Sequence, residues 1–205
     1  MAAPLLPVPL SSLMARRVTR TICLKAAENI VLAAGFADQL GLPLNRFVTV
    51  LWEGGQSIGT VQNPQGLFIE RMSKWLRYRN VSPAYLWVIE NGPANGLHSH
   101  ILIHVPSKHL KAFKRKAPTW VDGAIDKSTV NIQRTRYGHG LYRWNGLKGR
   151  LRYILKGGDK QVSKLISVDL KHQGTVVGKR SGTSQNIGVK ARQLKERWAA
   201  NEISF

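Results

Sequence analysis

The stretch AYLWVIENGPANGLHSHILIHVP, residues 84 to 106, decides the fold because two strand-like runs in it flank one short turn. The runs at 84–90 and 97–105 are rich in β-branched and aromatic residues, and the segment between them is rich in Gly, Pro and Asn. Such a pattern is typical of an antiparallel hairpin. We therefore expect two adjacent strands at the centre of a sheet.

The residues around this hairpin supply the remaining elements. Strands are predicted at 46–52 and 129–133, and helices at 21–40, 63–80, 107–117, 146–158 and 188–200. With one additional helix, the order is β-α-β-β-α-β, which predicts an α+β protein with the split ferredoxin-like arrangement. In that arrangement the antiparallel sheet carries its helices on one face and leaves the other face open to a ligand.

The composition predicts one main domain. A chain of 205 residues, 43% of them hydrophobic, can bury a single substantial core. We expect a flexible leader at 1–20, the main domain at 21–158 and a basic extension at 159–205 that packs on the same domain. The single cysteine, Cys23, excludes an internal disulfide and fits a reducing cytoplasm. No apolar run is long enough for a membrane span, so no membrane partner is expected.

The charge of the chain points to a polyanionic partner. Its 31 Lys and Arg outnumber 11 Asp and Glu, a formal net charge of +20. Most of the excess follows residue 107, where 22 basic residues face 6 acidic ones. A basic surface of this size is typical of nucleic-acid binding, although a basic surface that is merely solvated remains the alternative.

Three histidines interrupt the second strand of the hairpin. Alternate strand residues share a face, so His98, His100 and His104 are expected together on the open face. Two imidazoles on adjacent rungs can hold one divalent ion, and Glu90 across the hairpin would add the oxygen ligand that Mg²⁺ or Mn²⁺ prefers. His104 is expected as a fourth ligand or as a partner of a ligand. The alternative is that these are ordinary, half-exposed strand histidines.

A tyrosine and a lysine share one face of the helix predicted at 146–158. Tyr153 and Lys156 are three residues apart, so the phenol and the ammonium point the same way. A phenol with a pKa of about 10 is a poor nucleophile at neutral pH. A metal-polarised phosphate and a nearby positive charge would make its attack on phosphorus feasible. Alone this pair is weak evidence, since Tyr153 could equally be a core residue.

Together these motifs resemble the HUH endonucleases, the rolling-circle replication initiators and their relatives. The resemblance runs from Arg46 to Lys156 and begins with the hydrophobic strand FVTVLW at 47–52. The two metal-binding histidines of such proteins match His98 and His100, with Ser99 in place of the usual bulky residue, and the upstream acid matches Glu90. Tyr153 and Lys156 match the nucleophile motif of the single-tyrosine type.

The resemblance implies a nickase of single-stranded DNA. The strand would cross the open face, a Mg²⁺ or Mn²⁺ ion would polarise the scissile phosphate, and Tyr153 would attack it to form a 5′-phosphotyrosine bond while Lys156 orients the phosphate. Basic residues expected to contact DNA are Lys148, Arg150, Arg152, Arg134, Arg136, Lys179 and Arg180. Residues 174–180 lack the spacing of a phosphate loop, so the chain should depend on a host helicase and polymerase.

Several functions of this class share the same parts. The small size favours initiation of plasmid or phage replication in the cytoplasm of a bacterial host, with a hairpin origin as one expected kind of substrate. A relaxase and a single-strand transposase are alternatives within the superfamily. Outside it, the alternatives are a non-catalytic nucleic-acid-binding protein and a metal-dependent hydrolase that uses the histidines without the tyrosine.

Overall fold

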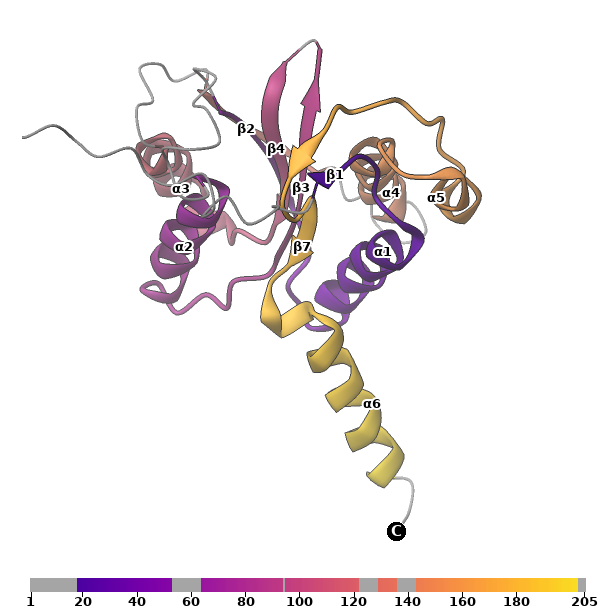
Figure 1. Ribbon diagram of the computed structural model, residues 1–205. Helices are drawn as coiled ribbons and strands as arrows, with labels where there is room; N and C mark the ends of the chain where they lie inside the picture. Colours follow the sequence, from indigo (N-terminus) through magenta and orange to yellow (C-terminus); the bar gives the residue numbers. More distant parts are fainter. Residues whose placement is uncertain (1–17, 53–63, 94, 122–128, 136–142, 203–205) are drawn as a thin grey trace, which may run out of the picture.

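A five-stranded antiparallel sheet forms the centre of the molecule (Figure 1). The computed structural model describes residues 18–52, 64–93, 95–121, 129–135 and 143–202. The strand order is β5-β2-β4-β3-β7, with β2 at Arg46–Leu51, β3 at Tyr85–Gly92, β4 at Gly96–Ile103, β5 at Val130–Arg134 and β7 at Ser181–Thr183. The predicted hairpin of β3 and β4 is confirmed, and Glu90 lies directly opposite His98.

Two helices cover one face of this sheet, as the predicted order requires. They are α2 (Pro64–Arg77) and α3 (Leu110–Lys116), and each connects two strands of the β-α-β-β-α-β unit. Phe68, Met72 and Leu76 recur every four residues along α2 and are fully buried. They join a cluster with side chains of β2 and β4, among them Val48, Val50, Ile101 and Ile103. The α+β fold class is thereby confirmed.

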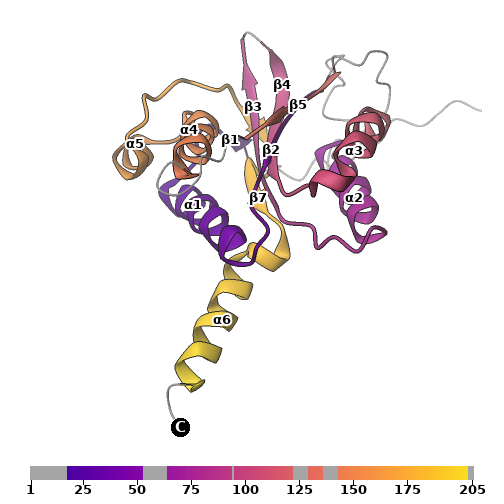
Figure 2. The same ribbon diagram turned by 180° about the vertical axis from the view of Figure 1, so that it is seen from behind.

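The opposite face, which carries His98 and His100 and is called the histidine face below, is also covered. Helices α1 (Leu24–Gln39), α4 (Arg143–Leu155) and α5 (Lys160–Ile166) lie on this side (Figures 1 and 2). The expectation that all helices share one face and leave the other open is therefore wrong. The physical reason is that the histidine face is apolar over much of its length: Phe47, Leu86 and Leu102 are buried there against α1 and α4.

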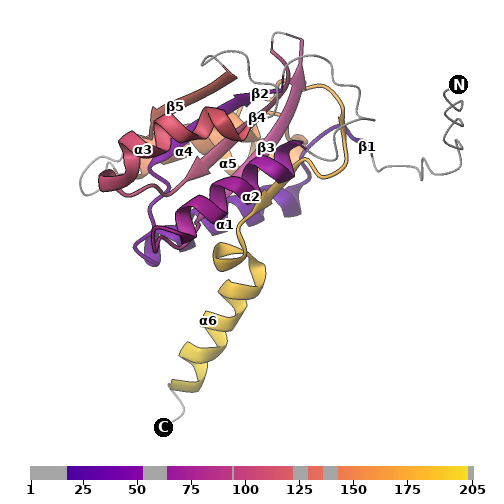
Figure 3. The same cartoon turned by 90° about the vertical axis from the view of Figure 1, so that its left-hand side faces the viewer.

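The C-terminal part contributes a strand that the sequence did not reveal. Between α5 and α6 (Val189–Glu202), residues expected to be irregular form β6 (Val176–Val177), paired with β1 (Val18–Thr19), and β7, paired with β3. A Cβ atom at Gly182 in β7 would come within 2.8 Å of the Trp87 ring, so only glycine fits there without displacement. Helix α6 extends away from the rest of the molecule (Figure 3).

Some predictions lie beyond what the structure addresses. Residues 1–17 of the expected leader are outside the described residues, and the division into leader, main domain and extension stays a prediction. Among the described residues, no helix has the length and apolar character to cross a membrane.

Candidate active site

Glu90, His98 and His100 form one compact, buried group. The register of β3 and β4 sets Glu90 opposite His98, and the period of two along β4 brings His100 to the same face. The Nε2 atoms of His98 and His100 lie 3.3 and 3.7 Å from Oε2 of Glu90. One ligand atom from each residue falls within 4.8 Å of the other two, a spacing that suits a single metal ion.

Neighbouring groups orient both imidazoles. The Nδ1 of His98 lies 2.9 Å from the Gly96 carbonyl oxygen, an acceptor, so this nitrogen carries the proton and donates. The Nδ1 of His100 lies 3.1 Å from the Thr49 hydroxyl. Phe47 stacks on the His100 ring with a centroid distance of 5.1 Å and an interplanar angle of 18°. These contacts turn each Nε2 toward Glu90, which is how proteins commonly hold metal-binding histidines.

The protonation states suit a divalent cation. Burial lowers the pKa of His100 by more than the Glu90 carboxylate raises it, which favours the neutral ring. Burial alone would raise the pKa of Glu90, but hydrogen bonds with His100, His98 and Lys156 together hold it well below its usual range. The Nε2 of His100 is buried and has no hydrogen-bond partner among the described residues. An anionic oxygen beside neutral nitrogens, one of them unpaired, fits a divalent metal.

Helix α4 brings Tyr153 and Lys156 next to this group. The Tyr153 ring meets the His100 ring at a centroid distance of 5.1 Å, and 43% of the tyrosine remains exposed. The Nζ of Lys156 donates to both carboxylate oxygens of Glu90 at 2.7 Å and lies 3.9 Å from the Tyr153 ring centroid. Burial and then the charge of Glu90 raise the pKa of Tyr153, against a smaller opposite effect of Arg150. The phenol is therefore protonated at neutral pH.

Comparison with known families now gives a context for this geometry. Residues 45–162 match the family model of the replication-associated protein ORF2. The chain belongs to this family. The matched region runs from the start of β2 into α5 and includes Glu90, His98, His100, Tyr153 and Lys156. No curated protein matches the chain.

Membership makes this a replication-associated protein of the rolling-circle initiator type. Such a protein binds DNA, which accounts for the net charge of +20.

Four of the basic residues expected at DNA have side chains that solvent can reach. Arg134, Lys148 and Lys179 are exposed, and Arg150 is half-buried. The Arg150 guanidinium donates to Oε1 of Gln133 at 2.7 Å and lies 4.5 Å from the Phe47 ring centroid, beside the candidate active site. Arg136 falls outside the described residues.

The other predicted residues are engaged within the protein. Arg180 is only 3% exposed, and its guanidinium donates to the carbonyls of Ile89, Arg20, Gln173 and Gly174. It joins β7 to the segments beside it, so its position does not support the predicted contact with DNA. Arg152 donates to the Ile166 carbonyl at 2.8 Å. The Nδ1 of His104 lies 2.9 Å from the Pro43 carbonyl oxygen, and His104 is not part of the metal-binding group.

Sequence reasoning missed the groups that orient the site. Thr49 and Phe47 lie on the histidine face of β2, and the alternation of strand residues puts them on a common face. Alternation does not say which residue of β4 each one meets. The register that pairs Thr49 with His100 depends on the whole sheet.

Proposed function

We propose that this chain nicks and rejoins single-stranded DNA through a 5′-phosphotyrosine intermediate, and so initiates rolling-circle replication of a plasmid or phage. The observation that carries the proposal is the contact between the Tyr153 ring and the His100 ring, 5.1 Å between centroids, at the edge of a group that suits a divalent metal. Tyr153 is 43% exposed, so a DNA strand can reach the phenol.

Glu90, His98 and His100 would hold a Mg²⁺ or Mn²⁺ ion, and when bound this ion would polarise the scissile phosphate as a Lewis acid. The hydroxyl of Thr49 and the carbonyl of Gly96 keep the two imidazoles aimed at that position. His104 is not needed for this set.

The chemical step is a transfer of the phosphoryl group from a sugar to the phenol. The Tyr153 oxygen forms a bond to phosphorus and loses its proton, the bond from phosphorus to the 3′ oxygen breaks, and the 3′ oxygen takes up a proton. The ester preserves the bond energy, so attack by a 3′ hydroxyl on the phosphotyrosine restores the strand without ATP. Since the pKa of Tyr153 is raised by burial, the rate of adduct formation should increase with pH through the neutral range.

Lys156 contributes positive charge between the carboxylate and the nucleophile. Its ammonium contacts Glu90 and lies against the Tyr153 ring. In this position it can stabilise negative charge that develops on the phenolic oxygen or on the phosphate. Single-stranded DNA, including a hairpin origin, would approach along Arg150, with the host helicase and polymerase acting in the host cytoplasm.

The deciding experiment detects the covalent bond. A labelled single-stranded oligonucleotide is incubated with Mn²⁺ and the wild-type protein, Tyr153→Phe or Tyr78→Phe, and the products are separated under denaturing conditions. Tyr78 is 87% exposed at the end of α2 and provides a matched control. We expect an adduct with the wild type and with Tyr78→Phe, none with Tyr153→Phe, and none after chelation, while Tyr153→Phe still binds the oligonucleotide.

Three results would contradict the proposal. An adduct with Tyr153→Phe would assign the nucleophile elsewhere. Chelator-sensitive cleavage without an adduct would indicate a hydrolase, and binding without cleavage would leave a non-catalytic DNA-binding protein. An adduct formed as proposed would still leave replication to be distinguished from conjugative mobilisation and transposition by the substrate that the protein prefers.

A further inference from the structure

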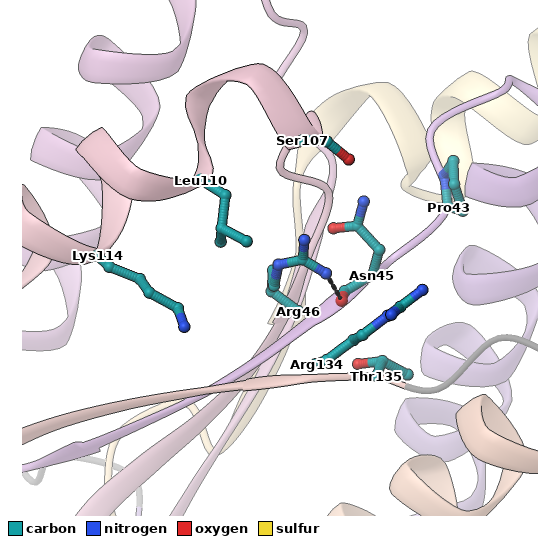
Figure 4. Close-up of a pocket in the computed structure, with 8 residues that line it drawn as sticks. All are labelled: Pro43, Asn45, Arg46, Ser107, Leu110, Lys114, Arg134 and Thr135. Carbon is teal, nitrogen blue, oxygen red and sulfur yellow. Dashed lines mark hydrogen bonds between the residues drawn. The ribbon is translucent and has the colours of Figure 1, made fainter.

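A second polar cavity lies at the other end of β2 from the metal-binding group. Its volume is about 550 Å³, within the range of ligand-binding pockets. Arg46 at the start of β2, Arg134 at the end of β5 and Lys114 of α3 all line it (Figure 4). These cations come from three separate elements and converge on one space, whereas the metal-binding group lies at the Leu51 end of β2, where Leu51 pairs with His98.

Arg46 is the unusual member of this set. Only 7% of it is exposed, and it lies directly opposite Arg134 across the strand pair. Its Nη1 donates to the Asn45 carbonyl at 2.7 Å, but its Nε is buried without a hydrogen-bond partner among the described residues. Burial and then the charge of Arg134 lower the pKa of Arg46. Like charges opposite one another and an unpaired buried donor both cost stability.

The pocket provides no counter-ion for these charges. None of the described residues that line it is acidic. The Oγ1 of Thr135, a lining residue that is 1% exposed, is a second buried polar atom without a described partner. A buried guanidinium normally has an anion or several acceptors around it. An anionic ligand with several oxygens would supply what the pocket lacks.

We propose that this pocket binds a phosphate group of the DNA strand, at a distance from the phosphate that Tyr153 attacks. The proposal rests on the proposed action on DNA, because a protein with a net charge of +20 that acts on DNA meets phosphodiesters above all other anions. Arginine forks bind phosphate oxygens in a bidentate manner, and a lysine adds a point charge. Arg46 and Arg134 supply the forks, and Lys114 supplies the point charge.

The edge strand β5 connects this pocket with the candidate active site. Successive residues of a strand face opposite sides, so Gln133 and Arg134 point to different faces. Gln133 accepts a hydrogen bond from Arg150 beside Phe47 and Tyr153, while Arg134 lines the pocket. Five residue steps separate Arg46 from Leu51, about 17 Å at 3.4 Å per residue. A single strand that leaves the active site over this edge can therefore reach the pocket within a few nucleotides.

The test uses the full chain and a signal that does not depend on nicking. The Nε–H resonance of Arg46 is followed by NMR while inorganic phosphate, or a DNA oligonucleotide without terminal phosphates, is added. Arg46 itself is left intact because its replacement endangers folding. The variants are Lys114→Gln and Arg134→Gln, both at exposed residues, and the matched control is Lys111→Gln, which removes the same charge from an exposed position of α3 that does not line the pocket.

We expect both ligands to shift the Arg46 resonance. Each pocket variant should weaken the affinity about tenfold, the effect expected when one charged hydrogen bond is removed, and Lys111→Gln should leave it nearly unchanged. For the oligonucleotide, the slope of log affinity against log salt should fall by about 0.7 for each phosphate that a variant no longer binds.

Three results would overturn the proposal. They are no shift with either ligand, equal affinities in the pocket variants and the control, and a shift with inorganic phosphate but none with DNA, which would assign the pocket to a free phosphate. The adduct assay, run on the same proteins, reports separately on Tyr153. Failure of the pocket and failure of the nickase are therefore distinguishable.

Discussion

Strand β4 buries side chains on both of its faces, but the two faces differ in chemistry. Ile101 and Ile103 are fully buried against α2 and α3 within an apolar cluster. On the other face, His98 and His100 are each only 3% exposed, yet they contact a carboxylate, a lysine and a tyrosine. Burial is the same on both sides, so burial alone does not distinguish a structural face from a functional one.

The difference lies in how completely the polar atoms are satisfied. The α2 and α3 side consists of apolar contacts that gain free energy from exclusion of water. The histidine face keeps an unpaired Nε2 on His100 and a cation held against Glu90. An incompletely paired buried group costs stability, and such groups concentrate where a ligand completes them. Substitutions on the two faces should therefore change different measurable properties.

The largest effect should come from truncation on the apolar face. Ile101→Ala removes a fully buried side chain and leaves a cavity, so the free energy of unfolding should fall by about 2–5 kcal/mol. Urea denaturation measures this loss. Mn²⁺ affinity of the folded fraction should stay within a factor of a few. A loss of stability below about 1 kcal/mol would show that this face does not dominate the core.

One residue away on the same strand, His100→Ala should do the opposite. Loss of a ligand should lower Mn²⁺ affinity by at least about 100-fold, the upper end of what loss of an outer-shell partner costs. Calorimetric titration measures the affinity, and urea denaturation should show little loss of stability. His104→Ala is the matched control, because His104 is outside the metal-binding group and contacts the Pro43 carbonyl. Equal losses in both variants would refute the assigned ligand set.

Lys156→Met should raise metal affinity while slowing the chemistry. The Lys156 ammonium lies 2.7 Å from both oxygens of Glu90, so its charge opposes that of a bound ion. Removal of a like charge at this range should strengthen Mn²⁺ binding by on the order of tenfold, after allowance for screening. Titration with Mn²⁺ and the rate of adduct formation measure the two effects. Unchanged affinity would mean that the ion and the lysine do not compete for Glu90.

The smallest effect is expected for Thr49→Val. This change preserves the shape of the side chain but removes the hydroxyl 3.1 Å from Nδ1 of His100. Loss of an orienting partner should weaken Mn²⁺ binding by about tenfold, without the larger loss expected for His100→Ala. Ser99→Ala on the opposite face, where Ser99 accepts a hydrogen bond from the Trp52 indole, is the comparison and should leave metal binding unchanged.

Much of the fold was predictable because it depends on short-range patterns. The period of two placed His98 and His100 on one face, and the turn between β3 and β4 brought Glu90 across from His98. Strand β7 was not predictable, since Ser181–Thr183 has neither apolar alternation nor β-branched runs. It pairs with β3 because Gly182 allows the Trp87 ring to approach and Arg180 ties together the neighbouring carbonyls.

The sequence by itself determined which residues could share a face: the histidines of β4, and Tyr153 with Lys156 on α4. These relations follow from the repeat of a strand or a helix, which spans only a few residues. Only the tertiary structure decided that α1 and α4 cover the histidine face, that Lys156 pairs with Glu90, and that Arg46 meets Arg134 in a pocket without an acid. Those contacts join residues far apart in the chain, and their formation depends on strand register and helix docking across the whole core.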